Sequence, residues 1–396
     1  MEELIEDSLR RVEKWVESRG YRGYEPFDGL NSFLRPLTFG NLFADRLLQQ
    51  LVRQSPINLR PLLGVKPNES TKGRGYMAWG YVTMLKLTGD PTYAVRATAC
   101  LDWLMEHRAP GHAGYSWGNH FPFSSRVGRI PKLEPIIPWA SLIGQAFLDG
   151  YEALGHEKYL NVAIGVCEWI KKVPRKHTET GVCLGYDIRR ESTVHGASML
   201  GAAMLARTAQ ITGDKSALDV AKQAMEYSCV RQNPDGSWPY SEEPNAMWID
   251  NFHTGYNLDS LKCYIDSTND QAYAGNLARG IAYFKDTFFE ESGRPKYYHN
   301  RVFPVDIQCA SQAIDTLALF SSAEDVGSLE LAKKVARWTI LNMQSTSGHF
   351  YYRQLPYATV KTPMLHWGQA TMYRALTHLL FKMRQQRAAT VPAIRT

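Results

Sequence analysis

The chain has 396 residues, of which 44% are hydrophobic and 21% charged, and its formal net charge is +6. That length exceeds the usual size of one compact core, so the chain either divides into domains or extends a single core around an axis. No linker-like composition and no block of like charge occurs, which favours one domain over residues 1–396 and argues against a nucleic-acid partner.

The first 20 residues mix charged and apolar side chains at helical spacing and lack the apolar core of a signal peptide. No run of about 18 apolar residues follows, so we expect no integral membrane segment and a cytoplasmic location. We expect residues 1–60 to hold helices that close the fold, and residues 385–396 to form a disordered tail.

An internal repeat dominates the rest of the chain. Apolar helical segments rich in small residues recur roughly every 55 to 62 residues, a period typical of helical-hairpin units. They cover residues 75–87, 136–154, 193–212, 249–266, 305–321 and 364–383. We call them the inner helices.

A more charged, amphipathic helix follows each of the first five inner helices after a very short turn. These outer helices are predicted at residues 93–107, 159–172, 217–230, 271–288 and 329–342. Their turns carry helix stop and start signals: Gly89 suits a left-handed stop, Asp90 a cap and Pro91 a first helical position.

The connections from each outer helix to the next inner helix are long, and loops of such length are usually functional. They cover residues 108–135, 174–192, 231–248, 289–304 and 343–363. Parallel inner helices would place all of these loops, and their own amino ends, on one face. We therefore predict an all-α (α/α)6 toroid, with short β-hairpins in the loops; an open α-solenoid is the alternative. The first helix, or one near residues 40–54, would close the ring.

Several loops contain a glycine followed by alternating aromatic residues, at 114–118, 236–240 and 348–352, with weaker copies at 181–186 and 295–298. This pattern predicts short hairpins over the ring mouth, where Trp and Tyr could stack on sugar rings. We expect Trp117, Trp238, Tyr240 and Tyr352 to contact substrate. The alternative is that these aromatics only pin the loops to the ring.

The candidate catalytic residues lie at the starts of inner helices. Asp250 and His253 are three residues apart and share one helix face, with Tyr256 one turn further and His195 opening another inner helix. Further expected substrate-binding residues are His120, Arg129, Asp187, Asp306 and His366. Neither HExxH nor a Gly-rich phosphate motif occurs, so we expect no metal and no cofactor.

Four segments carry a family resemblance: residues 195–202, 232–240, 248–255 and 306–313, of which the run DNFHTG from Asp250 to Gly255 is the most specific. They resemble the VpsJ-type proteins of bacterial exopolysaccharide and capsule loci, over roughly residues 25–384. The resemblance implies an (α/α)6 toroid that acts in polysaccharide biosynthesis, with glycan assembly proteins as partners. Gly196 stands where that family usually has Asn.

Four functions remain open. The first is proton transfer on a uronate-containing glycan by His and Tyr, as in an epimerase or lyase, and the second is hydrolysis by a carboxylate pair such as Asp250 with Asp306 or Asp187. The third is a non-catalytic glycan-binding or scaffold protein of an assembly system. The fourth, a terpenoid cyclase or prenyltransferase, rests on a QNPDGSW run that resembles a triterpene cyclase repeat, but the acidic DxDD motif is missing.

Overall fold

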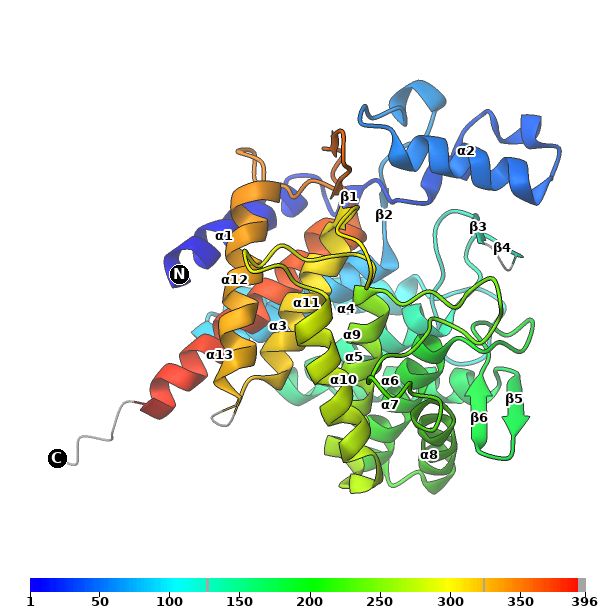
Figure 1. The fold of residues 1–396 in the computed structure, drawn as a ribbon, viewed down its shortest axis with the longest axis vertical. Coiled ribbons are helices and arrows are strands. Elements are labelled where there is room, and N and C mark those ends of the chain that lie inside the picture. Colours follow the sequence, from blue (N-terminus) through cyan, green and yellow to red (C-terminus); the bar gives the residue numbers. More distant parts are fainter. Residues whose placement is uncertain (126–127, 323–324, 391–396) are drawn as a thin grey trace.

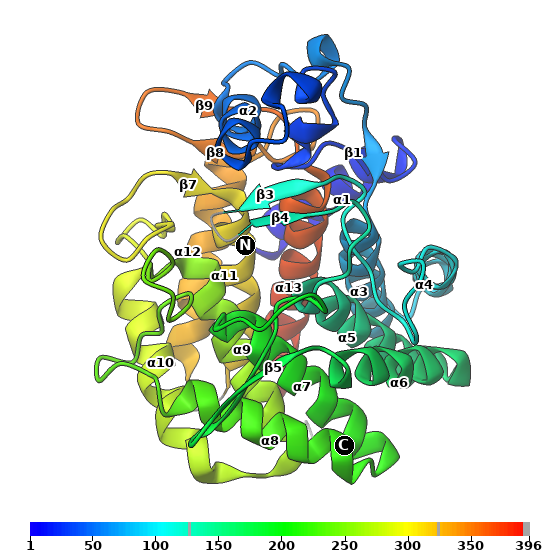
Figure 2. The same cartoon turned by 90° about the vertical axis from the view of Figure 1, so that its right-hand side faces the viewer.

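The computed structural model describes residues 1–125, 128–322 and 325–390. Its inner helices form a ring in which each packs against the next and the last packs against the first (Figures 1 and 2). They are α3 (Thr71–Thr88), α5 (Ile137–Leu154), α7 (His195–Thr212), α9 (Asn251–Thr268), α11 (Ile307–Phe320) and α13 (Thr371–Thr390), the last preceded by the π-helical segment η5 (Leu365–Ala370). The fold is the predicted (α/α)6 toroid.

An outer helix follows each of the first five inner helices. These are α4 (Pro91–Glu106), α6 (Glu157–Lys171), α8 (Lys215–Cys229), α10 (Ala274–Thr287, after the 3-10 turn η4, Gln271–Tyr273) and α12 (Val326–Met343). The predicted turn at residues 89–91 is confirmed: Gly89 is left-handed with φ 69°, and Asp90 accepts a hydrogen bond from the backbone N–H of Thr92 at 2.9 Å. Gly213 and Asp214 repeat this turn.

The sixth outer place belongs to α1 (Glu2–Glu17), which packs against α13 and α12. A glycine in each long loop shows this. Each has a positive φ and lies so close to a carbonyl oxygen of the next outer helix that a Cβ atom would stand at most 2.7 Å from it. The pairs are Gly114 with Gly165, Gly181 with Gln223, Gly236 with Arg279, Gly293 with Lys334 and Gly348 with Arg11. The last pair shows that α1 occupies the same kind of position as the outer helices α6, α8, α10 and α12.

The helix α2 (Leu42–Gln54) is therefore not an outer helix. It lies at the amino ends of the inner helices, with the 3-10 turns η1 (Asp28–Asn31), η2 (Arg35–Thr38) and η3 (Pro61–Leu63) (Figure 1). Short antiparallel strands pair as β1 (Arg22–Gly23) with β2 (Asn68–Glu69), β3 (Phe123–Ser125) with β4 (Gly128–Ile130), and β5 (Arg175–Thr178) with β6 (Gly181–Leu184). A three-stranded sheet joins β7 (Val305–Asp306), β8 (Arg353–Gln354) and β9 (Thr359–Val360).

Three local expectations need correction. The aromatic stretches at 114–118, 236–240 and 348–352 do not form hairpins, because their rings are used to dock the loops on the helices, as shown below. The first inner helix begins at Thr71 rather than at residue 75. Residues 385–390 belong to α13 rather than to a tail, and residues 391–396 lie outside the described part of the chain.

Within the described residues, none of the helices combines the length and the apolar character needed to cross a membrane.

Candidate active site at the mouth of the ring

A cavity of about 560 Å³ lies at the amino ends of the inner helices, and α2 contributes to its wall. Because inner helices begin in the same register, the second residue of each of five of them faces this cavity. These residues are Lys72, Pro138, Gly196, Phe252 and His366, the last counted from the start of η5. The ring thus brings together residues that are far apart in the sequence. We call this cavity the mouth cavity.

Asp250 and His253 form a hydrogen-bonded dyad on its wall. Asp250 is the N-cap of α9 and accepts from the backbone N–H of His253 at 3.0 Å. Its other oxygen lies 2.7 Å from Nδ1 of His253 and accepts from Nε1 of Trp248 at 2.8 Å. Asp250 is buried behind His253, whose side chain lines the cavity. A neutral imidazole that donates a hydrogen bond from Nδ1 to a carboxylate carries its proton on Nδ1 and a lone pair on Nε2. A general base requires such a lone pair.

His366 and Glu25 form a second imidazole–carboxylate pair. Nδ1 of His366 lies 2.5 Å from Glu25, which also accepts from the backbone N–H of His366 at 3.0 Å. Burial alone would raise the pKa of Glu25, but the neighbouring His366 and His120 outweigh it and lower that pKa. Burial lowers the pKa of His366, and for His120 it does so to about 4.

A third carboxylate, Asp306, stands behind Arg353. Two guanidinium nitrogens of Arg353 bond to Asp306, one of them at 3.0 Å, and Nε1 of Trp367 donates to Asp306 at 2.8 Å. Asp306 is fully buried, whereas Arg353 and Trp367 line the mouth cavity. In each of these three pairs the carboxylate of Asp250, Glu25 or Asp306 lies behind the cavity wall. The basic residue bound to it is part of the wall.

Lys72 is a site residue that our sequence analysis missed. It is 4% exposed, its Nζ lies 3.5 Å from the hydroxyl of Tyr256, and the ring centroid of Trp139 is 4.8 Å away. Among the described residues it forms no salt bridge, and burial lowers its pKa to about 7. Buried lysines of this kind are typical of functional sites.

The charge of the mouth cavity is one-sided. Its wall includes Arg46, Arg53, Lys72, Arg301 and Arg353, and no Asp or Glu among the described residues. Of these five, Arg353 is paired with the buried Asp306 behind the wall. The amino ends of the inner helices add partial positive charge at the same face. The cavity is therefore suited to an anionic ligand.

Aromatic rings make up much of the remaining wall. Tyr240 stacks on Trp248 with ring centroids 4.4 Å apart, and its edge meets His253 at 4.6 Å. Other aromatic residues on the wall include Trp139, Tyr186, Tyr297, Tyr298 and Trp367. Aromatic faces beside cationic groups can bind the apolar face and the polar edge of a sugar.

The structure divides the predicted site residues into two groups. His253, Tyr256, Tyr240 and His366 lie on the wall of the mouth cavity, with Asp250 and Asp306 directly behind it. The predicted residues that are not on its wall are His195, Trp117, His120, Arg129, Asp187, Trp238 and Tyr352.

Packing explains why the two loop tryptophans and His195 are elsewhere. Nε1 of Trp117 donates to the carbonyl of Leu104 at 2.9 Å, and Nε1 of Trp238 donates to that of Ser228 at 2.9 Å, so each caps the last turn of an outer helix. His195 is fully buried, and its Nδ1 lies 3.2 Å from Oγ of Ser228. These side chains pin loops to helices, which was the alternative to substrate contact.

Salt bridges and hydrogen bonds engage three further predicted residues. Arg129 pairs with Asp45 of α2, and Asp187 pairs with Arg189 at 2.6 Å. The hydroxyl of Tyr352 lies 2.5 Å from Nε of Arg53, so Tyr352 positions a wall residue instead of forming the wall.

No three His, Cys, Asp or Glu side chains are placed to hold a metal ion in the described part of the chain.

The comparisons with known proteins concern the fold. No protein-family model and no curated protein sequence matches the chain. Among solved structures, it is similar to a cellobiose 2-epimerase from Bacillus thermoamylovorans, with a TM-score of 0.63, 9% identity, and coverage of 80% of this chain and 88% of that one. A GH76 α-mannanase from Bacteroides thetaiotaomicron gives a TM-score of 0.63, 14% identity, and coverage of 80% and 88%. A D-mannose isomerase gives a TM-score of 0.58, 11% identity, and coverage of 80% and 87%. At such low identity these similarities establish the (α/α)6 architecture.

Proposed function

We propose that this chain is a carbohydrate-active enzyme that transfers a proton on an anionic, uronate-containing glycan. The observation that carries the proposal is the His253–Asp250 dyad on a cavity wall with five basic side chains and, among the described residues, no carboxylate. The structural neighbours include an epimerase, an isomerase and a mannanase, which supports carbohydrate chemistry at the mouth of this ring.

In the proposed reaction Nε2 of His253 removes the C5 proton, which is acidic because it lies next to the uronate carboxylate. The electron pair enters the carboxylate system, where Lys72 and the arginines stabilise the added negative charge. Return of a proton to the other face of C5 gives the epimer, whereas loss of the C4 substituent with its bonding electrons gives the unsaturated product. Burial raises the pKa of Tyr256 well above 10, so its hydroxyl keeps a proton to donate, and Lys72 at 3.5 Å would stabilise the phenolate.

Carboxylate-based hydrolysis has less support. A glycosidase needs two carboxyl groups that flank the scissile bond. Asp250 and Asp306 are buried behind His253 and Arg353, and Asp187 is buried and paired with Arg189.

A cyclase of isoprenoid substrates also has less support. The bore does contain a carboxylate pair deeper than the aromatic wall, Asp259 and Asp315, which our sequence analysis did not expect. However, Arg207, Arg374 and His378 line the same space, and burial of a hydrocarbon against charged groups would be costly.

The test is incubation with glucuronate- and mannuronate-containing oligosaccharides in heavy water. We expect deuterium at C5 by NMR, or ultraviolet absorbance from an unsaturated uronate, and neither with neutral manno- or cello-oligosaccharides. His253→Ala should lower this rate about 10²- to 10⁴-fold, as for loss of a general base. The matched control is His177→Ala, the exposed residue of strand β5, which should leave the rate unchanged.

Two results would contradict the proposal: full exchange in His253→Ala, or hydrolysis of a neutral glycan. Binding of a uronate oligosaccharide with no exchange and no elimination would instead favour the scaffold function.

We further propose, from the resemblance to VpsJ-type proteins, that the reaction belongs to exopolysaccharide or capsule synthesis in the cytoplasm, next to glycan assembly proteins. Deletion of the gene should then change the uronate composition of the cell's polysaccharide. An unchanged uronate composition would contradict a role in exopolysaccharide or capsule synthesis.

A further inference from the structure

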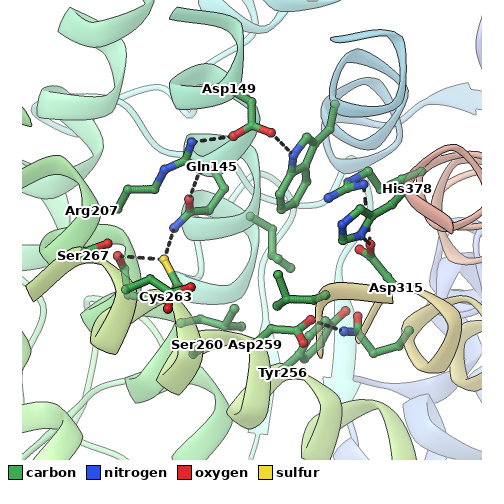
Figure 3. Close-up of a pocket in the computed structure, with 18 of the residues that line it drawn as sticks. Gln145, Asp149, Arg207, Tyr256, Asp259, Ser260, Cys263, Ser267, Asp315 and His378 are labelled. Atoms are coloured by element: carbon green, nitrogen blue, oxygen red, sulfur yellow. Dashed lines mark hydrogen bonds and ion pairs between the residues drawn. The ribbon is translucent and has the colours of Figure 1, made fainter. Parts of the chain in front are cut away.

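A second cavity, of about 390 Å³, lies deeper in the ring (Figure 3). Residues from every inner helix line it, and only Tyr256 and Leu200 are shared with the wall of the mouth cavity. Its rim includes the exposed Gln210 and Asp266 near the ends of α7 and α9. We call it the carboxyl-end cavity.

Both guanidinium groups of this cavity lie beside carboxylates. Arg207 donates to Asp149 at 2.5 Å and to Gln145 at 2.8 Å (Figure 3). Arg374 lies 3.5 Å from Asp315, which also bonds to Nδ1 of His378 at 2.5 Å. Asp315 offsets the charge of Arg374, although Nε and Nη1 of Arg374 have no hydrogen-bond partner within the described residues.

Asp259, in contrast, forms no salt bridge within the described residues. Its Oδ2 accepts from Nε2 of Gln312 at 2.7 Å, whereas its buried Oδ1 has no hydrogen-bond partner within the described residues. The adjacent Ser260 is 2% exposed, and its hydroxyl is likewise unpartnered there. Burial, together with the charge of Asp315, raises the pKa of Asp259 well above its usual value. A carboxyl group in this state gains most from a ligand that brings positive charge.

The other acidic groups of the cavity also favour a positively charged ligand. Four acidic side chains line the cavity, Asp149, Asp259, Asp266 and Asp315, against two arginines, and burial lowers the pKa of His378, which favours its neutral ring. Asp266, at the rim, is paired with Lys262 at 3.0 Å. The carboxyl ends of the inner helices add partial negative charge. A metal ion is not the expected occupant, because no three ligating side chains converge here or elsewhere among the described residues.

We propose that the carboxyl-end cavity binds a small organic cation, with its ammonium group held by Asp259 and Ser260. The volume is within the range of small-molecule sites. An amino sugar and an aliphatic diamine share the required alkylammonium group. This site is separate from the proposed proton-transfer centre and does not depend on it.

The test is calorimetric titration of the full chain with glucosamine, 1,4-diaminobutane and glucose, at low salt and a pH of about 6.5, where the amines are protonated. Glucosamine differs from glucose only in the amine. We expect binding of at least one ammonium probe, and at least about tenfold weaker binding of glucose, since a desolvated charge pair is lost. Equal binding of glucose and glucosamine, or no binding of either ammonium probe, would overturn the proposal.

Location is tested with Asp259→Asn, which should weaken binding of the ammonium probe at least about tenfold. The matched control is Asp266→Asn at the rim, where the side chain is 57% exposed and the effect should stay within about twofold. Unchanged binding in Asp259→Asn, or loss of binding in His253→Ala, would overturn the assignment. If Asp259→Asn does not fold, the comparison of glucosamine with glucose on the unmodified chain still decides whether the chain binds an organic cation.

Discussion

At the scale of single residues, the site depends on side chains whose partners come from other segments. Asp250 and His253 are an exception because they lie three residues apart at the start of one helix, and this spacing allowed both to be predicted from the sequence. His366 was also expected at the site, but its partner Glu25 lies 341 residues away. Lys72 has no sequence signal by itself, because its significance arises from burial without a salt bridge.

Lys72 provides a stability prediction. Its pKa is about 7 in the folded chain and 10.5 when unperturbed, so the unfolded state binds more protons between these values and stability rises with pH across that window. Below pH 7 Lys72 is protonated in both the folded and the unfolded state, so the folded state bears the full cost of burying the ammonium group. Lys72→Met should therefore stabilise the fold by about 1 to 4 kcal/mol near pH 6, and by less near pH 9. Urea denaturation measures both values.

The control is Lys66→Met, where the side chain is exposed and the change should stay within about 0.5 kcal/mol. An equal gain for Lys72→Met at both pH values would show that Lys72 keeps an ordinary pKa.

At the scale of elements, each long loop is anchored by a left-handed glycine that allows its backbone to touch the next outer helix. In two of the loops a buried ring that follows the glycine, Trp117 or Trp238, also caps the preceding helix. We had assigned these rings to the substrate. Some aromatics on the mouth wall come from the first turns of inner helices or the residues just before them, such as Trp139 and Trp248. Others come from the long loops themselves, such as Tyr186, Tyr240 and Tyr297.

Gly236→Ala should therefore destabilise the chain. Its φ is 92°, and a Cβ atom would stand 2.4 Å from the carbonyl oxygen of Arg279. We expect a loss of at least about 1 to 3 kcal/mol in urea denaturation. Gly275→Ala, on the neighbouring helix α10, is the control: an added Cβ would meet only Nη1 of Arg279, at the ordinary contact distance of 3.6 Å, and the change should stabilise by about 0.5 to 1 kcal/mol. Equal effects would mean that the close approach is not required.

At the scale of the whole molecule, closure of the ring makes the two ends of the chain depend on each other. Helix α1 packs against α13, and Trp15 of α1 contacts His349 of the last long loop with ring centroids 5.6 Å apart. The parallel inner helices also give the bore two chemically different ends, a cationic mouth and a carboxylate-rich far cavity.

Trp15→Ala tests the closure. Trp15 is buried, so its truncation should cost about 3 to 5 kcal/mol in urea denaturation. Phe43→Ala on α2, where the ring is exposed, should change stability by no more than about 0.5 kcal/mol. A larger effect at Phe43 than at Trp15 would indicate that α2, rather than α1, stabilises the ring.

The sequence by itself determined the repeat, the alternation of inner and outer helices, and the turns between them, because these follow from local periodicity and from residues such as Gly89 and Asp90. It also determined the Asp250–His253 pair, since both lie on one helical turn. Only the tertiary structure decided that α1 closes the ring, that Trp117 and Trp238 donate hydrogen bonds to outer helices, and that Lys72, Arg353 and His366 share one wall. Those facts depend on which helix faces point into the bore, and that is fixed by packing between segments hundreds of residues apart.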